Sequence, residues 1–262
     1  MSKKLLFNSD KETDRVNMID KNYNYFIFDT NLTDRTDTVN IALEIANLNH
    51  EDNKGEKPDL VDWGDGEINT DIGHSYNKKG IYVVKTKHVI HRNLNHPSYN
   101  KDTKDQLIGC LNLNKNNIYN FGGLFSGCEN LRTLDFSLFD LSNTVFMNSA
   151  FEDCINLRSI NLRNVNTSNT TNMYRMFWGC NSLISLDLSS FDTCKVTNME
   201  GMLTNCKSLK FLNLSGWGLS ELSKYTGMFD HCDSLTLDNI IMDGCSKETK
   251  EIIITAFNNR KL

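Results

Sequence analysis

The chain has 262 residues, of which 39% are hydrophobic and 23% charged, and its formal net charge is −5. This composition excludes a disordered tail and argues against a nucleic-acid-binding protein, which usually carries a basic stripe. No apolar run approaches the roughly 20 residues of a membrane-spanning helix, so we expect no membrane insertion. The length is sufficient for two domains.

The N-terminal segment 1–20 is polar and charged, and we interpret it as an arm. Its apolar stretch, Leu5 to Phe7, is shorter than the roughly 7–15 residues of a secretory signal, so no export signal is expected. Two interpretations of the arm stay open. It is either a disordered leader or a docking segment that becomes ordered on a partner.

Residues 21–92 have the apolar alternation and turn signals of β-strands. The segments that carry these signals are 25–28, 39–43, 60–66, 74–76 and 80–84. In the third of them, Asp65-Gly66 is a hairpin signal. The segments Trp63-Gly64-Asp65-Gly66, His74-Ser75-Tyr76 and Gly80-Ile81-Tyr82-Val83-Val84 resemble the signature of the polycystic-kidney-disease-like (PKD-like) β-sandwich, "WGDG…HxY…GxYxV". The resemblance implies an immunoglobulin-like sandwich.

Two groups of residues in this region could suggest ligands. Trp63 and Asp65 could form a sugar-binding pair, but in the PKD-like family the Trp is usually core and GDG is the turn. A structural role is therefore the favoured interpretation. His88 and His91 could suggest a metal, but residues i and i+3 of a strand face opposite sides, so shared ligation is not expected.

Residues 118–243 repeat with a period of 26 residues. Cys128, Cys154, Cys180, Cys206 and Cys232 define the period, and apolar columns lie three and seven residues before them and three and eight residues after them. The preceding segment, 93–117, is a polar connection. Its end, Leu111-Asn112-Leu113, has the apolar alternation of a strand and is expected to cap the first coil.

Each repeat divides into two halves. Met173, Met176, Phe177 and Cys180 have the spacing i, i+3, i+4 and i+7, which predicts a short helix. In the next repeat, Thr197 and Glu200 match a capping box. The column just before each cysteine holds residues that tolerate a left-handed backbone, and it is interpreted as the helix stop. These are Gly127, Asp153, Gly179, Asn205 and His231.

The second half of each repeat reads L-x-x-L-x-L, as in Leu183, Leu186 and Leu188, and predicts a short strand. Stacked repeats would bury both apolar faces and align the strands in a parallel sheet. The intervening side chains would point outward, and this outer strand face is the predicted binding surface. Its residues are Thr133, Asp135, Ser159, Asn161, Ser185, Asp187, Phe211 and Asn213.

The repeat resembles that of the BspA-like leucine-rich-repeat surface proteins, "VTNMxxMFxxCxxLxxLDLSxFDTS". The matching residues include Val196-Thr197-Asn198-Met199, Met176-Phe177, Cys180, Leu183 and Leu186 to Thr193. Ala150, Val165 and Asp238 depart from the pattern. The expected fold class is α+β: a PKD-like sandwich followed by a solenoid of five coils, each with a short helix and a parallel strand. Residues 244–262 should form a capping helix that begins near Ser246.

The cysteine column is interpreted as a structural ladder of buried, reduced thiols. Parallel side chains in adjacent strands keep their Cβ atoms about 4.8 Å apart, whereas a disulfide prefers about 3.8 Å. The cysteines lack the spacing of a tetrahedral metal cluster, so no metal and no other cofactor is expected. Cys110, Cys194 and Cys245 lie outside the column, and Cys194 is the expected exposed thiol.

The sequence contains no phosphate-binding loop, nucleophile elbow or HExxH motif, so we expect no enzyme. The first hypothesis is a recognition protein that binds a protein or glycan, as the BspA-like resemblance implies, on a bacterial cell surface. The second is a bacteriophage virion component, a decoration or adhesion protein attached to the capsid or tail, whose N-terminal arm would dock on other virion proteins. The second is favoured because no export signal is seen. An intracellular scaffold is the third.

Overall fold

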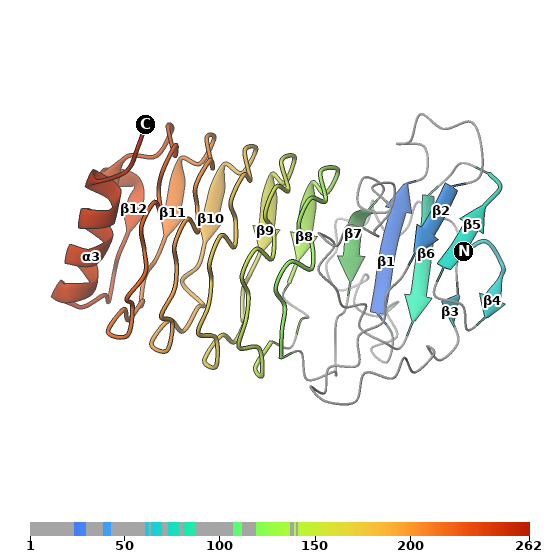
Figure 1. Ribbon diagram of the computed structural model, residues 1–262, viewed down its shortest axis with the longest axis horizontal. Helices are drawn as coiled ribbons and strands as arrows, with labels where there is room; N and C mark the ends of the chain where they lie inside the picture. Colours follow the sequence, from blue (N-terminus) through green and yellow to red (C-terminus); the bar gives the residue numbers. More distant parts are fainter. Residues whose placement is uncertain are drawn as a thin grey trace.

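The computed structural model describes residues 24–29, 39–42, 61–62, 64–69, 73–78, 81–86, 107–111, 119–136, 139 and 141–262. The described part is mostly β-structure, with one α-helix and one short 3₁₀ helix, and its class is α+β. The predicted arm at 1–20, Trp63 and the pair His88 and His91 lie outside the described residues. Figure 1 shows N-terminal strands at one end, a row of short strands in the middle and α3 at the other end.

The N-terminal strands form two antiparallel sheets. The larger has the order β4-β3-β6-β1-β7, and the smaller pairs β2 with β5. The strand bounds are β1 Asn24–Asp29, β2 Val39–Ala42, β3 Val61–Asp62, β4 Ile68–Asn69, β5 Gly73–Tyr76, β6 Ile81–Thr86 and β7 Leu107–Leu111. Phe26 of β1 is opposite Val84 of β6, and both side chains are buried. Alternate apolar residues predict these strands because one face of the sheet, which includes Phe26 and Val84, is buried.

β7 connects this sheet to the row of short strands. It pairs antiparallel with β1 and also lies beside β8 (Figure 1). β7 ends at Leu111, within the fragment expected to cap the first coil. The end of the first coil is therefore covered by a strand that also belongs to the N-terminal sheet.

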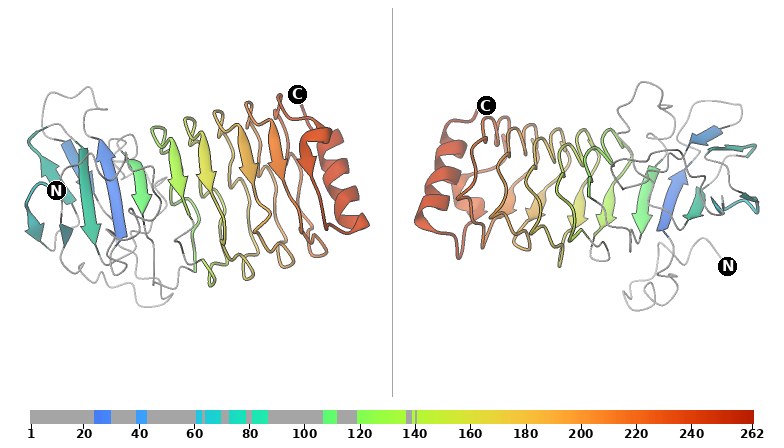
Figure 2. Two further views of the ribbon diagram at one scale, coloured as in Figure 1. Left: turned by 180° about the vertical axis from the view of Figure 1, so that it is seen from behind. Right: turned by 60° about the horizontal axis from the view of Figure 1, so that its bottom comes forward.

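The repeats form stacked coils that pair in parallel at a spacing of 26 residues. The short strands are β8 Thr133–Asp135, β9 Ser159–Asn161, β10 Ser185–Asp187, β11 Phe211–Asn213 and β12 Ile240–Ile241. β8 pairs with β9, and β10, β11 and β12 form a second sheet. Half a coil away in sequence, single parallel bridges join Asn120 to Phe146, and continue through Asn172 and Asn198 to Lys224. Both views in Figure 2 show the coils side by side.

The short helix expected in each coil is not formed. Residues 121–128 are a run of turns, as are the equivalent residues of the later coils. The N–H groups of Phe121, Gly123, Phe125 and Gly127 donate to carbonyl groups of the next coil, at distances of 2.7–2.9 Å. The N–H groups of Leu124, Ser126 and Cys128 instead donate to the carbonyl three residues earlier in the same coil. Alternate N–H groups therefore stabilise the stack, and a helix would leave the neighbouring coil without these donors.

Each coil has two residues with a left-handed backbone in this region, which allow the chain to form the run of turns. The column just before each cysteine has positive φ in all five coils, from 55° at His231 to 75° at Gly179, so the predicted left-handed conformation is confirmed. Its interpretation as a helix stop is wrong, because a second left-handed column lies four residues earlier and no helix precedes the stop. The members of this second column are Gly123, Ser149, Arg175, Gly201 and Gly227.

The capping box expected at Thr197 and Glu200 has another role. The Thr197 hydroxyl donates to the carbonyl oxygen of Thr171, one coil away, at 3.2 Å. The Glu200 N–H donates to Asn198 Oδ1 at 3.0 Å. The polar residues at this position therefore join coils and close a local turn.

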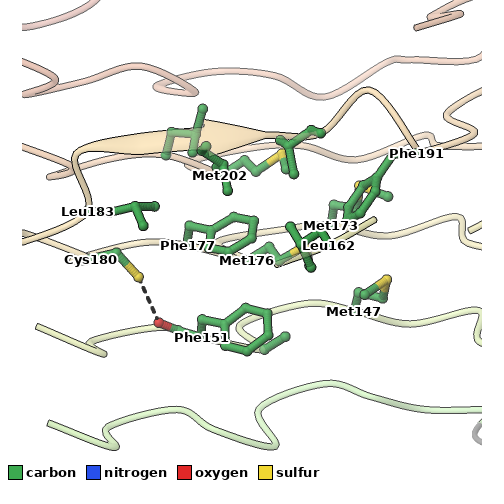
Figure 3. Close-up of a cluster of buried hydrophobic side chains, with 14 of the residues drawn as sticks. Met147, Phe151, Leu162, Met173, Met176, Phe177, Cys180, Leu183, Phe191 and Met202 are labelled. Carbon is green, nitrogen blue, oxygen red and sulfur yellow. Dashed lines mark hydrogen bonds between the residues drawn. The ribbon is translucent and has the colours of Figure 1, made fainter. Parts of the chain in front are cut away.

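The interior of the coils is a continuous apolar core. Figure 3 shows Phe151 and Phe177 above one another, and their rings stack with centroids 5.2 Å apart. Met173, Met176 and Leu183 surround them and are fully buried. Burying each such side chain contributes about 1.5–3 kcal/mol, so the core is the main stabilising feature of the stack.

The last coil is closed by α3 (Lys247–Asn258) and the residues after it. The Ser246 hydroxyl accepts a hydrogen bond from the Thr249 N–H at 3.1 Å, as expected of an N-cap. Phe257 of α3 packs edge-on against Phe229 of the last coil. The His231 N–H donates to the Lys261 carbonyl at 2.7 Å. In each earlier coil, the equivalent N–H donates to a carbonyl of the following coil. The C-terminal residues thus replace a sixth coil.

Candidate binding surface

The cysteine ladder is structural. Cys128, Cys154, Cys180, Cys206 and Cys232 are buried and unbridged. The Cys180 thiol donates to the Phe151 carbonyl at 3.2 Å, and the thiols of Cys154, Cys206 and Cys232 make the equivalent bond to the preceding coil. Burial raises the pKa of Cys180 and Cys206 well above the ordinary thiol value and that of Cys232 to about 12. These thiols are hydrogen-bond donors as well as small apolar groups.

Cys194 is the exposed thiol in the described part of the chain, as the sequence predicts. The pKa of the Cys194 thiol is raised, mainly by its hydrogen bond with the Asp192 side chain and less by its slight burial. A thiol that ionises only above its ordinary pKa is a poor nucleophile at neutral pH.

The Asp65 side chain is held by its own turn. Its Oδ1 accepts from the Glu67 N–H at 3.1 Å, and its Oδ2 lies 2.7 Å from Nε2 of His74, a largely buried side chain on β5. Burial alone would raise the pKa of this carboxyl, but these hydrogen bonds outweigh it and hold the pKa below its ordinary value. Asp65 thus ties the β3–β4 turn to β5, which supports its structural interpretation.

One column of the predicted outer strand face is exposed throughout, and the other is half-buried except at the exposed Asp187. Thr133, Ser159, Ser185 and Phe211 are exposed, and Phe211 has 56% of its surface accessible. In the other column, Asp187 and Asn213 accept hydrogen bonds from the N–H and hydroxyl of the serine two residues later. Asn161 donates to Asp135 at 3.0 Å. The polar groups of this second column are thus largely used within the protein.

A hollow lies over the other ladder, the row of parallel bridges. It has a volume of about 460 Å³ and is lined by Asn120, Phe146, Asn148, Asn172, Tyr174 and Asn198. We call it the asparagine groove. Asn120, Phe146, Asn172 and Asn198 occupy the bridge positions of four successive coils, and Asn148 and Tyr174 lie two residues further along their coils. The six residues meet only because coils 26 residues apart are stacked.

Two asparagine amides of the groove are fixed through their oxygen atoms. Oδ1 of Asn172 and Asn198 accepts the N–H two residues later, at 2.9 and 3.0 Å. Within the described residues, the Nδ2 groups of these two amides make no hydrogen bond, and the Asn148 amide makes none. The turns at Asn172 and Asn198 therefore orient these two amides and leave their N–H donors available.

The aromatic rings of the groove are held from outside it. Tyr119 packs edge-on against Phe146, with ring centroids 5.6 Å apart. The Arg175 guanidinium lies 5.1 Å from the Tyr174 ring centroid and 4.2 Å from that of Trp178, and it forms an ion pair with Glu152 at 3.4 Å. Cation–π contacts of this kind contribute about 0.5–1 kcal/mol each at exposed sites. The contacts with Arg175 restrict the movement of the Tyr174 ring, which lines the groove.

Sequence reasoning places the binding surface on the strand face and misses the asparagine groove. A signal is present in the sequence: Asn120, Asn172 and Asn198 share one position of the repeat. In the described ranges, His, Cys, Asp and Glu side chains form no group of three that could hold a metal ion. Of the helices that the structure describes, none has the length and apolarity needed to cross a membrane.

The stacked coils match a described protein family. Residues 119–242 match the family described as "Mycoplasma protein of unknown function, DUF285". The curated proteins and the solved structures contain no match to the chain. The stacked coils, from the start of the bridge ladder to β12, are thus the part of this chain that is similar to DUF285.

Proposed function

We propose that the chain is a non-catalytic recognition protein that binds a protein or a glycan on the surface of its coils. The observation that carries the proposal is the asparagine groove, where amides and aromatic rings from four coils line one hollow. Aromatic side chains beside placed polar groups in a concave site are typical of ligand binding.

The proposal includes a finer description of the fold. The coils are interpreted as a leucine-rich-repeat-like solenoid of the BspA-like type, and the N-terminal strands as a PKD-like β-sandwich. The regular 26-residue pairing of β8 with β9 and of the bridge ladder supports the first interpretation. The two antiparallel sheets and the Asp62–Ile68 hairpin pairing support the second.

The proposed location is a bacteriophage particle, with the chain as a capsid- or tail-attached decoration or adhesion protein. Mass spectrometry of purified particles tests this directly, because the chain must be present in stoichiometric amount. A bacterial cell surface is the second candidate, and the match of residues 119–242 to a family described from Mycoplasma favours it. Surface proteolysis of intact cells should then remove the chain.

Recognition itself is tested with the labelled full chain on protein and glycan arrays. A recognition protein should give saturable binding to at least one surface, and the heat-unfolded chain should give none. Absence of saturable binding on both arrays would exclude the proposed function.

A further inference from the structure

We propose that the asparagine groove binds an extended, uncharged glycan, with about one pyranose ring for each coil. This inference rests on the proposed recognition function and names the ligand class for one surface. It starts from the chemistry of the lining: four amides and two aromatic rings, with no charged side chain among the six residues.

Amides and aromatic rings together match the two kinds of group that a sugar presents, its hydroxyl groups and its apolar C–H surface. A carboxamide presents a donor and an acceptor in one plane, so it can bind neighbouring hydroxyl groups of a pyranose. An aromatic ring packs against the C–H face of the same pyranose, where apolar area is buried without loss of hydroxyl hydrogen bonds. The open Nδ2 groups of Asn172 and Asn198 and the amide of Asn148 supply such donors beside Tyr174.

The lining also argues against a charged ligand. The Arg175 side chain, which lies against the Tyr174 and Trp178 rings, is already paired with Glu152 at 3.4 Å. The next position of the bridge row, after Asn198, is Lys224 of the fifth coil. The uncharged part of the row therefore covers four coils and ends there.

The spacing of the coils distinguishes a glycan from a peptide. Adjacent parallel strands lie about 4.8 Å apart, so equivalent positions of successive coils repeat at about that distance along the groove. This is close to the length of one pyranose unit in an extended polysaccharide. An extended peptide presents equivalent groups every two residues, about 6.6–6.8 Å, and it would lose register with the coils within one repeat.

Three substitutions test the site without removing its turns. In Asn172→Asp and Asn198→Asp, Oδ1 can still accept the N–H two residues later, while the Nδ2 donors are lost. Asn148→Ala removes an amide that makes no hydrogen bond in the described structure. The matched control is Asn166→Asp, which adds the same charge outside the groove. Asn166 accepts the Ser168 N–H, and Asp192 makes the same bond one coil later.

A fourth variant, Asn213→Asp, tests the strand face. Asp187 occupies the equivalent position in the paired strand, so the exchange should be tolerated there. All variants are first compared with the wild type by thermal unfolding, so that loss of the fold is not read as loss of binding.

The experiment measures binding of the full chain to an array of neutral hexasaccharides, including cello-, manno- and chitohexaose, with an array of extended uncharged peptides beside it. We expect saturable binding to at least one hexasaccharide, weakened at least tenfold by Asn172→Asp, Asn198→Asp and Asn148→Ala and unchanged by Asn166→Asp and Asn213→Asp. Absence of hexasaccharide binding, binding lost only in Asn213→Asp, or groove-dependent binding of peptides alone would each overturn the proposal. Saturable binding of a protein or a charged glycan would leave the recognition function intact while excluding this ligand class.

Discussion

The thiol of Cys180 donates a hydrogen bond to the backbone carbonyl of Phe151, 29 residues earlier and one coil away, at 3.2 Å. Phe151 O also accepts the Cys154 N–H within its own coil at 3.1 Å. The column that marks the period in the sequence thus joins each coil to the one before it through a backbone acceptor. This relationship explains why a cysteine recurs at a buried site where a disulfide is not formed.

The first prediction concerns this thiol. Cys180→Ser should lower the free energy of unfolding by about 1–3 kcal/mol, because the shorter C–O bond leaves a buried hydroxyl too far from the Phe151 carbonyl. Denaturant unfolding measures the difference. The same exchange at exposed Cys194 is the control and should change stability by less than about 0.5 kcal/mol. Equal effects at the two sites would contradict the hydrogen-bonded ladder.

The second prediction concerns alkaline pH. The Cys232 thiol keeps its proton in the folded state up to a pKa of about 12, whereas it ionises from about pH 9.0 once unfolded. Above pH 9.0 the unfolded state therefore binds fewer protons, and stability falls by about 1.4 kcal/mol per pH unit for this thiol.

The measurement compares the wild type with Cys232→Ala from pH 8 to pH 11 by denaturant unfolding, so that other titrating groups cancel. The difference in unfolding free energy should be constant below about pH 9 and then decrease as pH rises. A difference that stays constant across the whole range would show that burial does not perturb this thiol.

The third prediction separates crowding from backbone strain. Gly179 and Gly216 both have positive φ, 75° and 78°. A Cβ at Gly216 would meet no atom within 4 Å, whereas one at Gly179 would collide with the Asp153 carboxylate, one coil earlier. Gly216→Ala should cost about 1–2 kcal/mol for the left-handed backbone, and Gly179→Ala about 1 kcal/mol more for the displaced carboxylate. Equal melting temperatures would contradict the tight stacking of this column.

The fourth prediction concerns Arg175, which has a left-handed backbone with φ of 51° in a column where Gly201 follows one coil later. Arg175→Gly relieves about 1 kcal/mol of strain and loses two cation–π contacts and a partly exposed ion pair, which together contribute about 1–2 kcal/mol. Stability should therefore change by less than about 1 kcal/mol, while glycan affinity falls because Tyr174 is no longer held. A large loss of stability would show that Arg175 mainly supports the fold.

The sequence predicts the strands, the period and the left-handed column before each cysteine, because each depends on residues close in the chain or on exact repetition. It does not distinguish a helix from the turns at residues 121–128. The apolar spacing of Phe121, Leu124, Phe125 and Cys128 satisfies both, and the deciding hydrogen bonds are made to the next coil. The second left-handed column, with Gly123, Gly201 and Gly227, is the signal that argues against a helix.

The asparagine groove is not predicted for a related reason. Phe146 and Tyr174 interrupt the asparagines in the sequence, and only stacking shows that these rings and amides share one surface. The strand face is polar and regular in the sequence, but Asp187 and Asn213 serve their own turns. Asn172 and Asn198 of the groove also accept an N–H of their own turns, so the pattern of polar residues in the sequence does not distinguish the two surfaces.

The most direct test of the glycan-binding claim is the dependence of affinity on ligand length. Titration calorimetry with the wild-type chain would compare the di- to hexasaccharides of the sugar that the array selects. Because the uncharged row covers four coils, affinity should rise with each pyranose up to about four and then stay level. Equal affinity for the disaccharide and the hexasaccharide, or binding too weak to saturate at any length, would contradict the account.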